Sequence, residues 1–146
     1  MGKGFMRWRE FATNSSDLPI GLVIQNGTAE RKLKPEVIAA YESPFPDVTY
    51  KAGAMIFPLL VPLSHDDPGA AEMRRARAVF SRWQKPVLVM FSDKDPITRG
   101  GEVFFRSLIP GAKDQPEMVI HDAGHFLQED KGEEIAQHIV DFIART

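Results

Sequence analysis

A chain of 146 residues falls within the ~100–200 residues of a single domain, and 43% hydrophobic with 26% charged residues predicts a folded globular protein. The net charge of −2 argues against a nucleic-acid-binding protein, and the lack of cysteine excludes disulfides, thiolate chemistry and cysteine-based zinc sites. No apolar run approaches the ~18 residues of a membrane span, and the first residues lack the apolar stretch of a signal peptide. We therefore expect a cytoplasmic protein with no membrane partner.

The first half of the chain predicts short helices separated by proline and glycine. Aromatic residues recur three apart over residues 5–13, which is typical of one helical face, and residues 20–25 form an apolar run. Pro35 opens a further short helix. Residues 52–63 are long enough for another helix, but we expect Pro58 to kink or end it.

The second half predicts alternating helices and strands. Residues 69–83 have the apolar stripe of an amphipathic helix, and the continuous apolar run at 86–91 predicts a strand buried on both faces, as in a parallel sheet. A helix at about 101–108, a second short strand at 117–120 and a closing helix follow. This order is typical of the end of a parallel α/β fold.

The predicted sheet is too small to be stable alone. Two parallel strands expose backbone groups on both edges, and such a sheet does not normally make an independent core. The simplest interpretation is that the chain is the end of a longer protein, and we expect self-association through the exposed sheet edges.

Acidic and histidine side chains follow the two predicted strands. Asp93 and Asp95 come after the first strand, and His121 and His125 come after the second. Ligands of parallel α/β sheets bind beyond the carboxyl ends of the strands. Two adjacent parallel strands would bring these two loops together at that edge. An Asp that orients a His is the acid–base pair of a hydrolytic triad. On residue type alone, each Asp also fits a helix cap and each His a polar turn, so the roles stay open at this point.

Two segments carry a resemblance to the α/β-hydrolases. FSDKDPITRG (residues 91–100) and HDAGHFLQED (residues 121–130) are similar to the ends of the last two core strands of that superfamily. The match implies that Asp95 is the acid and His125 the base, with Asp93 as the competing acid. Ser92 stands where members usually carry glycine, a departure expected to affect mainly the turn.

The first half adds a resemblance to the haloalkane dehalogenases with a helical cap and an Asp nucleophile. It rests on GFMRWREFATNSSDL (residues 4–18) and AAYESPFPDVTYKAGAMIFPLLVP (residues 39–62), together with the tail. The implied fold is the C-terminal portion of an α/β-hydrolase: a helical cap segment over residues 1–64 and the last two βα units of the core over residues 65–146.

The same resemblance implies roles for four cap residues. The Gly-Phe-x-x-Trp pattern makes Trp8 the residue whose indole N–H binds the departing halide. Phe5, Phe57 and Pro58 match positions that line the apolar substrate cavity. Without the resemblance, we would interpret Trp8 as a core aromatic and Phe57 and Pro58 as packing residues.

The chemistry implied is cleavage of a carbon–halogen bond with water, through an ester on an Asp nucleophile. The partners would be a small haloalkane and a halide ion, and no metal or organic cofactor is required. The sequence contains no G-x-S-x-G or G-x-D-x-G nucleophile elbow and no second halide-binding tryptophan, since Trp83 reads as a packing residue. We therefore expect the isolated chain to be inactive.

Two alternatives remain open from the sequence. The first is another capped α/β-hydrolase: an esterase, or an epoxide hydrolase that would use the two tyrosines, Tyr41 and Tyr50, to polarise the ring oxygen. The second is a non-catalytic fragment, or a partner that completes the sheet of another chain.

Overall fold

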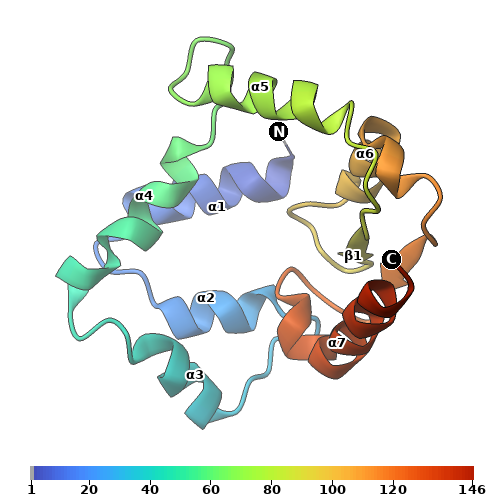
Figure 1. Ribbon diagram of the computed structural model, residues 1–146. Helices are drawn as coiled ribbons and strands as arrows, with labels where there is room; N and C mark the ends of the chain where they lie inside the picture. Colours follow the sequence, from blue (N-terminus) through green and yellow to red (C-terminus); the bar gives the residue numbers. More distant parts are fainter. Residues whose placement is uncertain (1) are drawn as a thin grey trace.

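The computed structural model describes residues 2–146, with helices in the first half and two strands alternating with helices in the second (Figure 1). The first-half elements are α1 (Lys3–Asn14), α2 (Ile20–Gly27), α3 (Pro35–Glu42), the 3-10 turn η1 (Val48–Lys51) and α4 (Ala52–Leu60). The second-half elements are α5 (Ala70–Phe80), β1 (Met90–Ser92), α6 (Gly101–Leu108), η2 (Pro110–Ala112), β2 (Met118–Ile120) and α7 (Leu127–Arg145).

The first-half helices form two packed pairs, α1 with α4 and α2 with α3. Arg9 of α1 donates to the carbonyl oxygens of Pro58 at 2.8 Å and Leu59 at 3.3 Å, at the C-terminal end of α4, where carbonyls have no partner within the helix. α4 contains Pro58 and ends two residues after it, at Leu60, so the helix stops short of residue 63 and close to the proline that we expected to kink or end it. Contact with α1 and the Arg9 hydrogen bonds support this last turn.

A buried lysine ties the two helix pairs together. Lys51 is 6% exposed, and its Nζ donates to Asp17 Oδ1 at 2.7 Å and to the Leu18 carbonyl oxygen at 2.8 Å. Glu42, at the end of α3, adds a second carboxylate, whose Oε2 lies 3.4 Å from Lys51 Nζ. The hydrogen bond to Asp17 raises the pKa of Lys51 above its ordinary value, so the ammonium stays charged.

The sheet consists of β1 and β2, which are parallel, with Phe91 paired with Val119 in the register. The predicted strand at 86–91 is shorter than expected, because β2 offers only three partners and Val87 instead donates to the Gly111 carbonyl oxygen at 3.0 Å. The predicted burial on both faces is wrong as well, since all three residues of β1 are half-buried. In the described part of the chain, β1 contacts α6, and Phe91 of β1 packs against the buried cluster of Val89, Ile109 and Ala112.

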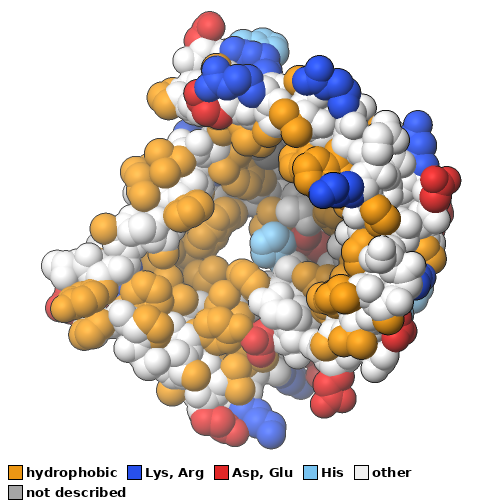
Figure 2. Space-filling model, in the orientation of Figure 1, with side chains coloured by type: hydrophobic (Ala, Val, Ile, Leu, Met, Phe, Trp, Pro, Cys, Tyr) orange, Lys and Arg blue, Asp and Glu red, His pale blue; other side chains and the backbone are white. Residues whose placement is uncertain are grey.

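The molecule is open, with its elements arranged around a central gap (Figures 1 and 2). Its accessible surface is 9873 Å², compared with ~7500 Å² for a compact monomer of the same mass. The apolar stripe predicted at 69–83 is not buried, since Met73 is 51% and Phe80 40% exposed. Within residues 2–146, no helix has both the length and the apolar character needed to cross a membrane.

Candidate active site

Two loops at the same edge of the sheet form the site: the acid loop (residues 93–98) after β1 and the histidine loop (residues 121–126) after β2. Backbone hydrogen bonds join them, because Asp93 N donates to the Ile120 carbonyl at 3.2 Å and Lys94 N to the Ala123 carbonyl at 3.1 Å. Asp95 Oδ2 then lies 3.0 Å from His125 Nδ1. The two side chains that the sequence paired are therefore in hydrogen-bond contact.

Asp95 is held by several donors at once. Its side chain is 4% exposed and accepts from Ile97 N at 2.7 Å, from Thr98 N at 3.2 Å and from the Thr98 hydroxyl. Burial raises the pKa of Asp95, but the hydrogen bonds from Thr98, His125 and Ile97 together outweigh it and hold the pKa below its usual value. Asp95 is therefore a carboxylate at neutral pH and accepts a hydrogen bond from the Nδ1–H of His125.

The competing acid, Asp93, has a histidine of its own. Its Oδ2 lies 3.1 Å from His121 Nδ1, and the neighbouring residues Lys94 and Asp122 form an ion pair at 2.6 Å. His121 is 77% exposed, whereas His125 is 31% exposed. The two Asp–His pairs have similar geometry, but only the Asp95 pair is sheltered from water.

His125 faces a cavity of about 840 Å³ between the first-half helices and the two loops. Figure 2 shows a largely hydrophobic inner wall with a histidine side chain in the opening. Phe5, Trp8 and Phe11 of α1 line this cavity together with His125 and Phe126. With Nδ1 bonded to Asp95, Nε2 is the ring nitrogen left to exchange a proton in the cavity.

A close backbone contact sets α1 beside the acid loop. A Cβ at Gly4 would lie 2.4 Å from the Pro96 carbonyl oxygen, so only glycine fits there. Trp8 follows one turn later, half-buried, with its ring centroid 6.0 Å from that of Phe11. This contact places Phe5 and Trp8 at the cavity, next to the residues that hold Asp95.

Four other residues considered from the sequence lie elsewhere in the described part of the chain. Phe57 is 71% exposed and Pro58 is buried, and neither lines this cavity. Tyr41 donates to Glu129 on α7, and Tyr50 is 61% exposed. The two tyrosines therefore do not face His125 as a pair.

Three residues that sequence reasoning missed support the site. Thr98 binds Asp95, Ser92 Oγ donates to the Gly124 carbonyl oxygen at 2.6 Å, and Asp130 Oδ2 accepts from Gly124 N at 2.8 Å. The i, i+3 spacing of Asp95 and Thr98 is typical of a capping contact, so this contact could have been predicted from the sequence. Ser92 was noted only as a departure from the usual glycine, and no local pattern indicates the contact that it or Asp130 makes with Gly124.

The arrangement supports acid–base chemistry. A carboxylate-supported imidazole that faces an apolar cavity takes a proton from water or from a hydroxyl group, with the carboxylate stabilising the imidazolium. Within residues 2–146, no three His, Asp or Glu side chains come together as a metal site.

Comparison with known proteins bears out the resemblance. No protein-family model matches the chain. It is 46% identical to a haloalkane dehalogenase from Psychrobacter cryohalolentis over 98% of this chain and 47% of that protein, and 46% identical to one from Mycobacterium marinum over 93% of this chain. The chain spans about half the length of these curated relatives and corresponds to a C-terminal part of them.

A solved structure agrees with the sequence comparison. The haloalkane dehalogenase from Paraglaciecola agarilytica, described as tetrameric, superposes with a TM-score of 0.82 at 28% identity over 94% of this chain and 46% of that one. The predicted fold class is therefore confirmed: two parallel strands with flanking helices, matching the C-terminal part of a dehalogenase α/β-hydrolase fold.

Proposed function

We propose that this chain supplies the cap and the acid–base pair of a haloalkane dehalogenase-like hydrolase, with the cap in residues 1–64 and core elements in residues 65–146. The observation that carries the proposal is the Asp95–His125 hydrogen bond of 3.0 Å beside an apolar cavity that Trp8 also lines. The complete enzyme would convert a haloalkane and water into an alcohol and a halide ion.

The reaction has two steps. A carboxylate supplied by another part of the enzyme attacks the carbon that bears the halogen, forming an ester and releasing halide with the bonding electron pair. His125 then takes a proton from water, the resulting hydroxide attacks the ester carbonyl, and the alcohol leaves with a proton returned from His125. Asp95 stabilises the imidazolium between these proton transfers.

Trp8 fits the role of halide donor. Its indole N–H donates without offering a competing nucleophile, and a halide that forms in an apolar cavity needs such a donor. The half-buried position of Trp8 at the same cavity as His125 supports this role.

The proposal is tested by a chimera in which the N-terminal part of the Psychrobacter relative precedes this chain, replacing the C-terminal part it matches. We expect the chimera to release bromide continuously from a bromoalkane, whereas the isolated chain releases none because it contains no nucleophile elbow. Halide and alcohol are measured in parallel. A folded chimera without turnover, or an isolated chain with turnover, would contradict the proposal.

Replacing Trp8 by phenylalanine in the chimera should weaken halide binding. Losing one hydrogen bond to a charged group reduces affinity roughly 10- to 100-fold, so the inhibition constant of bromide should rise by that factor. The control is Trp83→Phe, since Trp83 is 39% exposed and lies outside the cavity lining. Equal bromide inhibition of the chimera and its W8F variant would count against the role of Trp8.

A second candidate is a chain that completes the sheet of another polypeptide, or of a second copy of itself, without catalysis. The exposed apolar stripe of α5 and the large accessible surface favour it. Light scattering on the isolated chain distinguishes the cases, because self-association through exposed edges gives an oligomer. The epoxide hydrolase alternative finds no support in the positions of Tyr41 and Tyr50.

A further inference from the structure

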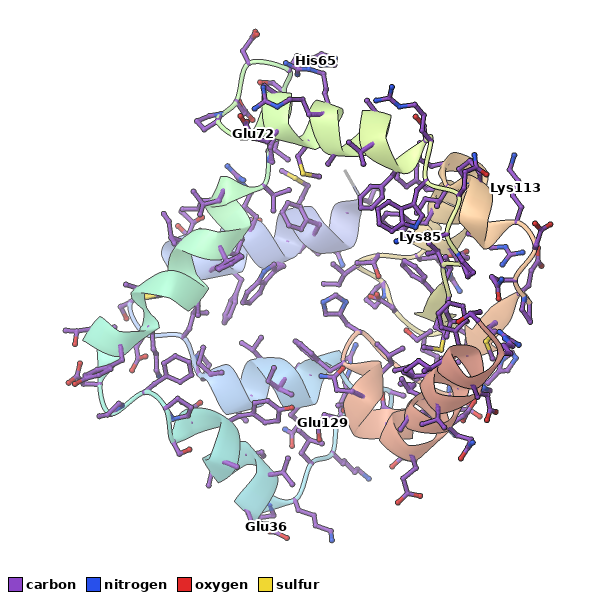
Figure 3. The ribbon with its side chains drawn as sticks, viewed as in Figure 1. Glu36, His65, Glu72, Lys85, Lys113 and Glu129 are labelled. Carbon is purple, nitrogen blue, oxygen red and sulfur yellow. The ribbon has the colours of Figure 1, made fainter. Side chains whose placement is uncertain are left out.

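The first turn of α7 is set apart from the rest of that helix. Lys131 has non-helical backbone angles, φ −141° and ψ 36°, so the turn that ends at Asp130 is a separate unit. Acidic residues in a first turn ordinarily favour the helix dipole. Here both acids bond to residues outside the helix. Glu129, labelled in Figure 3, accepts from Tyr41 of α3, and Asp130 accepts from the backbone of two loops.

One oxygen of Asp130 joins segments that lie far apart in the sequence. Oδ2 accepts from Gly124 N at 2.8 Å and from Ala29 N at 2.9 Å. Gly124 immediately precedes His125, and Ala29 belongs to the linking segment (residues 27–29), which begins with the last residue of α2. The carboxylate therefore connects the histidine loop directly to the first-half helices.

The two segments are in close contact around this carboxylate. A Cβ at Gly124 would lie 2.3 Å from the Gly27 carbonyl oxygen, and Phe126 N donates to that same oxygen at 3.2 Å. Gly124 is buried and Ala29 is half-buried. Because the two backbones approach this closely, water is poorly placed to replace Asp130 as the acceptor for both amides.

The Gly124 peptide groups are held from the other side as well. Ser92, at the end of β1, donates to the Gly124 carbonyl oxygen at 2.6 Å, and that carbonyl belongs to the peptide bond with His125. Asp95 fixes the imidazole ring through Nδ1 at 3.0 Å. Ring and backbone of His125 thus have separate supports, from different elements.

We infer that Asp130 is a positioning residue that holds the histidine loop against the linking segment and so sets His125 relative to the cavity. This role deepens the proposed function and rests on it, because it takes His125 as the base of ester hydrolysis. It predicts an effect on hydrolysis of the ester and none on the displacement of halide, which needs no base.

The first test measures amide hydrogen exchange in the full chain and does not depend on catalytic activity. In Asp130→Asn, a neutral oxygen replaces the charged one, and a hydrogen bond to a neutral acceptor is weaker, so amide exchange at Ala29 and Gly124 should accelerate about tenfold. Glu133→Gln, an exposed acid on α7 beyond Lys131, is the control and should leave both amides unchanged. Unchanged exchange at the two amides in D130N would overturn the inference.

The second test uses the chimera. D130N should lower the steady-state rate of alcohol formation about tenfold, while the rate of the first halide released per molecule stays the same. A loss of fold would lower both rates together, so the split between them identifies positioning. If both rates fall equally, or neither changes, the inference is overturned. A chimera without turnover would remove the proposed function but would leave the exchange result to decide whether Asp130 holds the two segments.

Discussion

Replacing His125 by alanine should convert continuous halide release by the chimera into a single burst of about one halide per protein molecule. The displacement step uses a carboxylate nucleophile and no base, so it proceeds, but the ester that it forms is then trapped. General-base catalysis contributes roughly 10²–10⁴-fold, and steady-state turnover should fall by that factor. Mass spectrometry should detect the alkylated protein.

His121 provides a matched control for this variant. It lies on the same loop, and its Nδ1 is 3.1 Å from Asp93, nearly the geometry of the His125 pair, but its side chain is 77% exposed. His121→Ala should therefore keep turnover. Continued alcohol formation by H125A, or an equal loss in H121A, would contradict the assignment of His125 as the base.

Replacing Asp95 by asparagine should lower turnover to a similar extent, by up to roughly 10⁴-fold, with the first halide still released. An asparagine amide group facing Nδ1 favours the tautomer with the proton on Nε2, so His125 no longer presents a free nitrogen to water. It also leaves no negative charge to stabilise the imidazolium. Pre-steady-state halide release reports the displacement step, which should continue, and steady-state alcohol formation reports hydrolysis of the ester, which should slow.

Asp93→Asn is the control for Asp95, because Asp93 is the other acid that the sequence allowed. Its partner His121 is exposed, so D93N should keep turnover.

Both variants should also lose stability, because the pKa of Asp93 is lowered in the folded chain as well as that of Asp95. The lowered pKa of Asp95 stabilises the folded chain above its unfolded pKa of about 3.9, and this contribution disappears as the pH falls through the folded value. Equal turnover in D93N and D95N would make the choice of acid wrong.

The pairing of Asp95 with His125 was predictable because it follows from topology. Each residue comes just after one of two neighbouring parallel strands, and the carboxyl ends of such strands meet at one edge. Choosing between Asp93 and Asp95 was not possible from local pattern. That choice depends on Thr98 and Ile97 folding back onto Asp95, and on burial, which leaves Asp95 only 4% exposed.

The expected cavity lining shows where local pattern reaches its limit. Phe5 and Trp8 line the cavity beside His125, while Phe57 and Pro58 lie outside its lining in residues 2–146. A helical stripe tells which residues share a face. It does not tell which neighbour that face meets, because this depends on contacts such as that of Gly4 with the Pro96 carbonyl oxygen.

The sequence by itself determined the types of element, their order, and the meeting of Asp and His side chains at one edge of the sheet, because helical periodicity and strand order are local or topological properties. Only the tertiary structure decided how the pair is supported. Asp130 and Ala29 are 101 residues apart and meet through docking of the linking segment on the histidine loop. Ser92, a minor departure by sequence, holds the Gly124 carbonyl. Such contacts form only when segments far apart in the sequence pack against each other, and no local sequence pattern predicts that packing.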